Sequence, residues 1–352
     1  MDILIFGGTG VMGNYLVDQL SSSENNIVVT TRLKREAKGS VKYVQGNAKD
    51  EEFFYSVISK HWDVIIDFMV YKTSEFQERI TPLLNATNQY VFLSSSRVYA
   101  ESGEPLKETS PRLLDQSKDY DFLRTDEYSL TKARQENLLI NSGKSNWTIV
   151  RPYITFGDYR LQLGTLEKED WLYRALRGRT IVFSSDIAQK MTTMTHGLDV
   201  AKGIASLIGD TKAFGEIFHI TTPKPIMWSE VLDTYLNAIG ILSENHPKIQ
   251  YINIDDFHKL HSAKYQINYD RMYDRVFDNS KIDKFIDVDN FGDSKDRLTM
   301  CLANFLEQPQ FKNINWKAEA LKDKITKEVA KLSEITGIKQ KLKYFLYRFV
   351  IS

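Results

Sequence analysis

The feature that most constrains the fold is a run of closely spaced glycines directly after the first apolar segment. Residues 2–6 are Asp-Ile-Leu-Ile-Phe, and Gly7, Gly10 and Gly13 follow as an amphipathic segment begins. A strand that leads through glycines into a helix is typical of dinucleotide sites, because glycine permits a tight turn, close approach of a pyrophosphate and close helix packing. Phosphate then lies at the helix N-terminus, where unpaired N–H groups and the positive end of the helix dipole meet. The pattern predicts cofactor contacts from Gly7, Thr9, Gly10, Val11, Met12 and Gly13.

The first half of the chain alternates short apolar runs with helical periodicity, which is typical of βαβ units around a parallel sheet. The segments 64–68 and 90–93 are almost wholly apolar, as expected of strands that are covered on both faces. The fold class is therefore α/β: a Rossmann-type doubly wound parallel sheet followed by a smaller mixed C-terminal substrate lobe. We expect strands at 2–6, 27–31, 42–44, 64–68, 90–94 and 148–150, and helices at 11–21, 51–60, 74–84 and 129–140.

The pattern changes after Arg151-Pro152, where longer polar loops separate the helical segments. Helices are expected at 167–176, 198–208, 228–239 and 316–335, with Gly240 as a natural stop for the third. We divide the chain into a dinucleotide-binding domain at 1–150, to which later segments return, a substrate-binding lobe at 151–315, and a helical, basic-aromatic tail at 316–352.

Composition excludes several classes of protein. Hydrophobic residues make up 42% of the 352 residues, and 46 basic residues balance 46 acidic ones. A net charge of zero gives no overall field that would attract nucleic acid. Cys301 is the single cysteine, and the six histidines lack metal-ligand spacing, so neither a disulfide nor a metal site is expected. The N-terminus lacks a signal-peptide pattern, which favours a cytoplasmic protein.

The end of the second predicted strand indicates which dinucleotide binds. A carboxylate there would hold the adenosine ribose of NAD, but the segment Thr30-Thr31-Arg32 has none. Arg32 is instead suited to the 2′-phosphate of NADP, with Lys34 or Arg35 assisting. NADP is therefore the predicted cofactor and NAD the alternative. The interpretation that assigns these cations no function is a basic loop exposed to solvent.

A tyrosine and a lysine four residues apart begin the predicted helix at 129–140. Tyr128 and Lys132 share one helical face, so the charge of the lysine favours the phenolate form and suits the tyrosine to acid/base chemistry. Ser94, Ser95 and Ser96 follow the preceding strand, at the sheet edge where such folds bind ligands. A hydroxyl there can hydrogen-bond a reacting oxygen.

These elements, together with Arg151-Pro152-Tyr153, resemble the extended short-chain dehydrogenase/reductase family, specifically its nucleotide-sugar epimerase/dehydratase branch. The resemblance covers about residues 1–285 and includes the segments 197–201, 215–220 and 278–281. It implies that Ser95 is the catalytic hydroxyl, Tyr128 the acid/base and Lys132 the residue that orients the cofactor. It also implies cofactor contacts from Asn47, Phe68, Ser94, Tyr128, Lys132 and Tyr153, and substrate contacts from Ser95, Ser96, Tyr128, Tyr153 and Arg160.

The resemblance also limits the reactions that are expected of this chain. Dehydrating and decarboxylating members carry acidic residues after the catalytic hydroxyl, where this chain has Ser96-Arg97. Two reactions of a nucleotide sugar remain: reduction of a 4-keto group, favoured by the missing ribose-binding acid, and 4-epimerisation with NAD. A shortened region between Asp67 and Ser94 resembles an atypical subgroup with RNA-binding members, so an RNA-binding or cofactor-sensing protein is the alternative from another class.

The C-terminal residues 339–351 mix cations with aromatic side chains, as helices at membrane surfaces do. Three interpretations remain open for this tail. It contacts an anionic membrane as a peripheral element, it docks on its own domain, or it pairs with a second copy in a homodimer.

Overall fold

The computed structural model describes residues 1–22, 24–243 and 246–351 and divides into two compact units. Unit 1 comprises Met1–Thr155, Thr193–Pro225 and Val276–Ser294. Unit 2 comprises Phe156–Thr192, Ile226–Arg275 and Lys295–Ser352. Both units are therefore assembled from segments that are far apart in the sequence.

Unit 1 is built on a seven-stranded sheet with the order β11-β6-β5-β4-β1-β2-β3, in which every pair of neighbours is parallel. The chain order reverses between β1 and β4, and the crevice at the carboxyl ends of two such strands is where open α/β sheets bind ligands. This confirms the predicted doubly wound α/β class. The strands are β1 (Asp2–Phe6), β2 (Asn26–Thr31), β3 (Val41–Gln45), β4 (Trp62–Asp67), β5 (Thr87–Leu93), β6 (Trp147–Pro152) and β11 (Glu216–Ile220).

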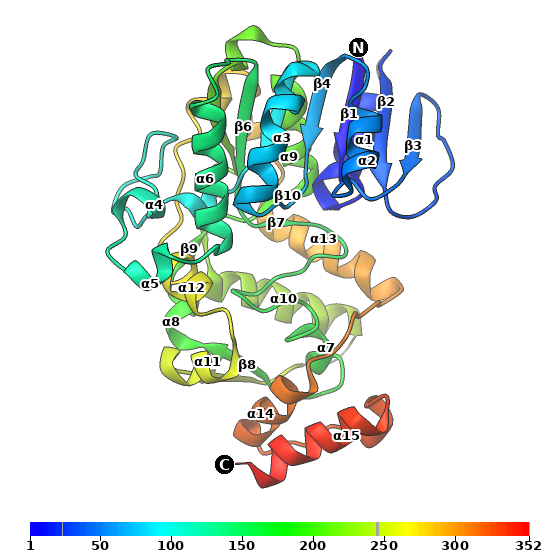
Figure 1. Cartoon of the computed structure of the whole chain (residues 1–352). Coiled ribbons are helices and arrows are strands. Elements are labelled where there is room, and N and C mark those ends of the chain that lie inside the picture. The colour runs from blue at the N-terminus through cyan, green and yellow to red at the C-terminus, as the bar shows by residue number, and fades with distance from the viewer. Residues whose placement is uncertain (23, 244–245, 352) are drawn as a thin grey trace. The chain divides into compact units, whose positions relative to one another are not determined.

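Apolar side chains on both faces of the sheet explain why it forms. Ile3 and Ile5 pack into one core cluster, and Leu4 and Phe6 pack into the other. Helices cover both clusters (Figure 1). The helices of unit 1 are α1 (Val11–Ser21), α2 (Glu51–Val57), α3 (Thr73–Asn85), α4 (Leu113–Gln116), α5 (Tyr120–Leu123), α6 (Tyr128–Ile140) and α9 (Gly197–Leu207), and β10 (Thr195–His196) precedes α9.

Unit 2 contains two short strand pairs and most of the later helices. β8 (Ile181–Ser184) pairs in parallel with β13 (Ile249–Ile252), and β9 (Met191–Thr192) pairs antiparallel with β12 (Ile226–Met227). β7 (Thr155–Phe156) spans the boundary between the units. The helices are α7 (Leu172–Ala175), α8 (Ser185–Ala188), α10 (Trp228–Ser243), α11 (Ile254–Leu260), α12 (Lys264–Gln266), α13 (Ser294–Glu307), α14 (Trp316–Thr326) and α15 (Ile338–Phe345).

Buried ion pairs attach α14 to the rest of unit 2. Arg174 donates to Glu319 over 2.9 Å and to Asp323 over 3.0 Å, and Arg179 donates to Asp323 over 3.2 Å. All four side chains are buried. Burial by itself would raise the pKa of Glu319, but the neighbouring cations lower it, so the carboxylate stays charged.

Several helix boundaries differ from the sequence prediction. The helix expected at 51–60 ends at Val57. The helix expected at 316–335 ends at Thr326, because Lys327 takes a left-handed conformation with φ 58°. The helix expected at 167–176 covers only Leu172–Ala175. Gly240 does not stop α10, which continues to Ser243, since an interior glycine costs a helix only about 1 kcal/mol relative to alanine.

The close approach of α1 to the turn before it generates a stability prediction. A Cβ atom at Gly13 would lie 2.6 Å from backbone atoms of Gly8, whereas one at Gly10 would meet no atom within 4 Å. We expect Gly13→Ala to lower the free energy of unfolding by about 1–3 kcal/mol through overpacking, and Gly10→Ala to lower it by less. Urea unfolding of the two variants measures this difference, and equal losses would contradict the packing role of Gly13.

Candidate active site

The glycine turn after β1 leaves open space in front of α1. Gly7 has φ +68°, a conformation that glycine adopts without strain, and Gly10 is the N-cap of α1. The space around the Cβ position of Gly10 is empty to 4 Å. The first N–H groups of α1 lack intrahelical partners by helix geometry. An anionic group therefore fits at this end of α1.

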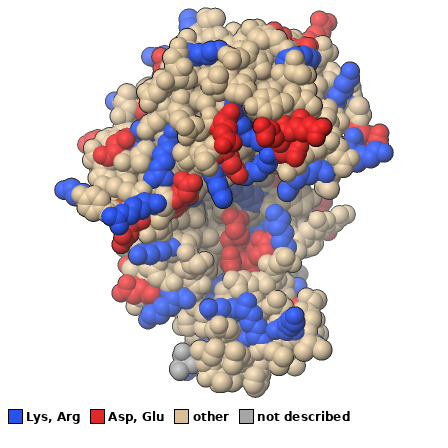
Figure 2. All heavy atoms as spheres, in the orientation of Figure 1, with Lys and Arg blue, Asp and Glu red and all other residues tan. Residues whose placement is uncertain are grey.

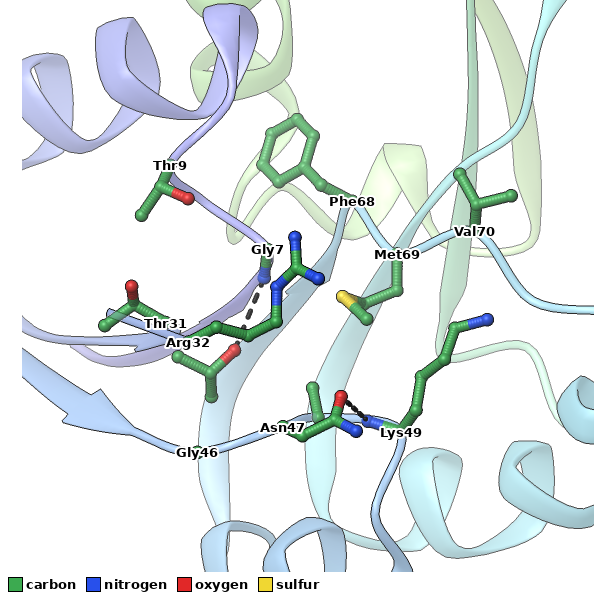
Figure 3. A pocket seen from close by; sticks show the side chains of 12 residues that line it. Gly7, Thr9, Thr31, Arg32, Gly46, Asn47, Lys49, Phe68, Met69 and Val70 are labelled. Atoms are coloured by element: carbon green, nitrogen blue, oxygen red, sulfur yellow. Dashed lines mark hydrogen bonds between the residues drawn. The ribbon is translucent and has the colours of Figure 1, made fainter. Parts of the chain in front are cut away.

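A cavity of about 360 Å³ opens beside this turn (Figure 3). Its walls come from the segments that follow β1, β2, β3 and β4, which meet at one edge of the parallel sheet. This is the edge at which the sequence predicts cofactor binding. The described residues that line the cavity are Gly7, Thr9, Thr30, Thr31, Arg32, Gly46, Asn47, Ala48, Lys49, Phe68, Met69 and Val70.

The cavity lining combines polar and apolar side chains and carries positive charge. Figure 3 shows the side chain of Arg32 extending from the end of β2 toward Gly7. Thr30 Oγ1 accepts a hydrogen bond from Gly7 N over 3.3 Å, and Asn47 Oδ1 accepts one from Lys49 N over 3.2 Å. Among the described residues that line the cavity, two are cations and none is a carboxylate.

The three serines after β5 have different surroundings. Ser94 Oγ donates to Glu136 Oε1 over 2.6 Å, and Ser96 Oγ donates to the carbonyl oxygen of Arg151 over 2.8 Å. Ser95 Oγ accepts a hydrogen bond from Arg97 N over 3.2 Å, so its own proton is not used in that bond. Among the contacts of the described residues, Ser95 is the one of the three serines whose hydroxyl donates no hydrogen bond.

Glu136 on α6 is the centre of a buried ionic network. Arg151 Nε donates to its Oε1 over 2.8 Å, and the Arg151 Nη2 donates to its Oε2 over 2.7 Å. Arg112 Nη1 adds a third contact over 3.2 Å. Burial opposes the charge of Glu136, yet the two guanidinium groups and the Ser94 hydroxyl together hold its pKa below the ordinary value. The network fixes α6 against β5 and β6.

Lys132 lies one turn before Glu136 and is almost fully buried. Its Nζ donates to the carbonyl oxygen of Leu93 at the end of β5 over 2.7 Å. Burial lowers the pKa of Lys132 to about 8, against the attraction of Asp67 and Glu136, which favours the charged form. The ammonium group has three donors, so two remain beyond the bond to Leu93.

Asp67 links the lysine to the cavity. This carboxylate ends β4 next to Phe68, and it accepts hydrogen bonds from Tyr90 Oη over 2.9 Å and from Met69 N over 2.8 Å. Burial raises its pKa, and these hydrogen bonds and Lys132 oppose that rise. The edge of β4 and β5 therefore connects the cavity lining with the residues on α6.

Tyr128 occupies the first turn of α6 and is partly exposed. The guanidinium carbon of Arg97 lies 5.2 Å from the centre of its ring. Arg97 also donates to Glu127 Oε1 over 2.5 Å, and Glu127 accepts from Ser129 N over 2.7 Å as the N-cap of α6. Arg97 therefore stands over the ring of Tyr128, a contact for which the sequence interpretation had given Arg97 no role.

The remaining predicted residues are spread over both units. Val11 and Met12 form the first turn of α1. Tyr153 is buried, and its ring centre lies 5.3 Å from that of Phe277 in unit 1. Lys34 and Arg35 are exposed, and Arg35 lies 5.7 Å from the ring centre of Tyr43. Arg160 belongs to unit 2 and is partly exposed.

Several residues with a place in this geometry were not predicted from the sequence. They follow the ends of the strands or face α6. Parallel sheets bind ligands at their carboxyl edge, and this rule could have identified the cavity residues from the sequence. The same rule applies to Asp67 at the end of β4, whereas Glu136 carries no such signal, because only packing brings its partners together. The missed residues are Thr30, Thr31, Gly46, Ala48, Lys49, Met69, Val70, Asp67, Arg97 and Glu136.

Comparison with known proteins relates the chain to one family. The model of the NAD dependent epimerase/dehydratase family matches residues 3–220. The chloroplast stem-loop binding protein of 41 kDa b from Arabidopsis thaliana is 26% identical over 275 residues, which are 72% of this chain and 67% of that protein.

Two solved structures share the fold. UDP-glucuronic acid 4-epimerase from Bacillus cereus, in complex with UDP-glucuronic acid and NAD, has a TM-score of 0.66 at 14% identity, covering 88% of this chain and 100% of that one. dTDP-glucose 4,6-dehydratase from Bacillus anthracis, in complex with NAD, has a TM-score of 0.65 at 17% identity, covering 88% and 97%. The family match confirms the resemblance expected from the sequence, and the two structures confirm the fold.

The network around Glu136 generates a prediction. We expect Glu136→Gln to lower the free energy of unfolding by about 3–5 kcal/mol, because it leaves the buried Arg151 guanidinium without its countercharge. Asp115→Asn is the matched control, since the side chain of Asp115 is exposed where it pairs with Arg112, and a pair with an exposed partner contributes at most about 1 kcal/mol.

Urea unfolding at neutral and acid pH measures both variants. The pKa of Glu136 is lowered by folding, so its stabilisation is complete above the unfolded pKa and is lost as pH falls through the lowered value. The difference between Glu136→Gln and the unmodified protein should therefore shrink in acid. Equal losses from Glu136→Gln and Asp115→Asn at neutral pH would show that the network does not hold α6.

Proposed function

Because the chain belongs to the NAD-dependent epimerase/dehydratase family, we propose that it is an NAD(P)-dependent nucleotide-sugar oxidoreductase that reduces the 4-keto group of a nucleotide-linked deoxysugar. The observation that carries the proposal is the geometry of α6. Tyr128 begins this helix, Lys132 reaches the carbonyl oxygen of Leu93 at the end of β5, and the Glu136 network fixes both.

The residues around the cavity fit a nicotinamide dinucleotide. The open space at Gly10 and the first turn of α1 suit a pyrophosphate, with Thr9, Val11 and Met12 beside it. Asn47 and Phe68 line the adjoining cavity, where an adenosine would bind. Arg32 suits a 2′-phosphate, and the absence of a carboxylate from the described lining favours NADP over NAD.

When bound, the reduced nicotinamide supplies the hydride that goes to C4 of the sugar. Tyr128 donates its phenolic proton to the C4 oxygen, and Ser95, whose proton is not used elsewhere among its described contacts, donates a hydrogen bond to that oxygen. Lys132 uses its two remaining donors to orient the cofactor ribose. Ser94 and Tyr153 stay proposed cofactor contacts, and Ser96, Tyr153 and Arg160 stay proposed substrate contacts.

Two features support reduction over the other reactions of the family. The segment after β5 carries Ser96-Arg97 in place of acidic residues, so this segment itself supplies no carboxylate to remove a proton from C5 of a sugar. The cations of the cavity lining favour a phosphorylated dinucleotide. In a reductase this dinucleotide exchanges between turnovers. An epimerase instead keeps its NAD, and this is the second candidate, favoured by the similarity to the B. cereus 4-epimerase fold.

A candidate from another class is a protein that binds RNA or senses the cofactor without turnover. The 26% identity to the A. thaliana stem-loop binding protein favours it. The balanced charge of the chain and the ordered Tyr128, Lys132 and Ser95 set support the enzyme instead. Binding of RNA that weakens with salt and survives Lys132→Ala would support this candidate.

The first experiment concerns the cofactor. We expect the purified protein to release no tightly bound NAD on denaturation, and the apoprotein to bind NADPH more tightly than NADH. Arg32→Gln should weaken NADPH binding by roughly 10- to 100-fold, the value of one charge-assisted contact, and leave NADH binding unchanged. Lys38→Gln is the control, since Lys38 is an exposed cation outside the described lining of the cavity. Tightly held NAD would favour the epimerase, and no binding of either nucleotide would contradict both enzymes.

The second experiment concerns turnover. Tyr128→Phe removes the phenolic proton and should lower the rate of NADPH oxidation with dTDP- or UDP-4-keto sugars by about 10²- to 10⁴-fold. Thermal stability should not change. Tyr120→Phe is the control, because Tyr120 is exposed on the neighbouring helix α5. An unchanged rate in Tyr128→Phe would remove the tyrosine from the chemistry.

A further inference from the structure

The C-terminal residues of unit 2 form a helix whose two faces differ. α15 (Ile338–Phe345) continues without interruption into a π-helical segment, Leu346–Val350. Figure 1 shows this helix in red beside α14. We refer to residues 338–350 as the terminal helix.

Polar contacts determine which face of the terminal helix is turned inward. The Tyr344 hydroxyl is buried, donates to Asp323 Oδ2 over 2.5 Å and accepts a hydrogen bond from Ala330 N over 2.7 Å. Arg348 Nε donates to the carbonyl oxygen of Glu328 over 2.8 Å. Asp323 is itself held by Arg174. The inner face is therefore anchored to the body of unit 2 through hydrogen bonds, one of them to an aspartate that is held in a buried ion pair.

The opposite face is apolar and lies at the surface. Its residues recur every three or four positions, so they form one continuous stripe along the helix, which we call the outer stripe. The exposed fractions are 77% for Ile338, 65% for Leu342, 56% for Phe345, 42% for Leu346 and 53% for Phe349. A contiguous exposed apolar surface on a protein marks a place where something binds.

Cations flank the outer stripe and acidic residues are absent from it. At about 100° per residue, Lys339 and Lys343 project on one side of the stripe, and Lys341 projects on the other. All three lysines are exposed. The segment 338–351 contains no Asp or Glu. Figure 2 shows the α14 and α15 end of unit 2 with blue and tan spheres and no red ones on the face in view.

We propose that the outer stripe docks the protein on an anionic lipid surface. The apolar side chains would enter the boundary between headgroups and acyl chains, and the lysines on both flanks would contact anionic headgroups. A second copy of the chain is a poorer fit, because two-fold pairing of the stripes would bring the lysines of one copy against those of the other. No helix among the described residues is long and apolar enough to cross a bilayer, so the contact is peripheral.

The anchoring contacts also form the docking surface in the free protein, before it binds a membrane. Tyr344 and Arg348 hold the terminal helix in place in the free protein, so binding need not fold it. A surface that is formed in advance loses less conformational entropy on binding. This distinguishes the terminal helix from tails that become helical only on lipid.

Sedimentation of the full-length protein with vesicles tests the proposal. We expect binding to vesicles that contain phosphatidylglycerol, and much weaker binding to vesicles of phosphatidylcholine alone. Replacing Lys339, Lys341 and Lys343 with Gln should weaken binding to the anionic vesicles by roughly 100-fold at low salt. Added salt should weaken binding of the unmodified protein in the same direction, because it screens the lysines.

The apolar part of the contact is tested by Leu342→Glu combined with Phe345→Glu, which should weaken vesicle binding by about 100-fold or more. The matched control is Ile241→Glu combined with Leu242→Glu, two exposed apolar residues at the end of α10 in the same unit. The control should bind vesicles normally. Thermal unfolding should be unchanged in both double variants, because the substituted side chains are exposed.

Four results would overturn the proposal. They are the absence of vesicle binding by the unmodified protein, equal binding to anionic and neutral vesicles, binding that survives Leu342→Glu with Phe345→Glu, and equal loss of binding in the control. Analytical ultracentrifugation identifies the alternative occupant. A dimer that dissociates in Leu342→Glu with Phe345→Glu, without vesicle binding by the unmodified protein, would assign the outer stripe to a second copy.

Discussion

The buried carboxylate of Glu136 is the interaction on which the candidate active site depends. Each of its oxygens has two partners: Ser94 and Arg151 contact Oε1, and Arg151 and Arg112 contact Oε2. A buried charge is tolerated only when it is paired and hydrogen-bonded in this way, so the network permits one register of α6 against β5 and β6. Tyr128 and Lys132 lie on the same helix, and that register sets where their side chains meet the edge of the sheet.

Unit 2 also contains a network of buried charges, and this network orients the terminal helix. Arg174 is buried between Glu319 and Asp323 on α14, and Asp323 also accepts the hydroxyl proton of Tyr344 from the terminal helix. Once these polar groups are satisfied, the orientation of the terminal helix is determined, and its apolar stripe is the face left outside. The exposed stripe is thus a consequence of where the buried charges require their partners. It does not result from a loosely attached tail.

The parts that could be predicted from the sequence depend on short-range patterns. The local geometry of the turn after β1 is predicted by Gly7, Gly10 and Gly13, and the apolar runs predict strands that are buried on both faces. The ends of the helices in unit 2 could not be predicted in this way. The helix expected to reach residue 335 stops at Thr326, where Lys327 takes a left-handed conformation, and Glu328 beyond it accepts hydrogen bonds from the Thr180 N–H and hydroxyl groups. That partner lies far away in the sequence.

The sequence alone determined four features of this protein, because each follows from neighbouring residues and from helical or strand periodicity. They are the fold class, the dinucleotide pattern after β1, the cation Arg32 where NAD-binding proteins carry an acid, and the spacing of Tyr128 and Lys132. The tertiary structure decided which serine hydroxyl is left to donate, that Arg97 stands beside the ring of Tyr128, and which face of the terminal helix is exposed. These outcomes depend on pairings between residues that folding brings together, such as Ser94 with Glu136 and Tyr344 with Asp323. A charged or polar group that loses water on burial must find a partner, and only the folded chain determines which one is within reach.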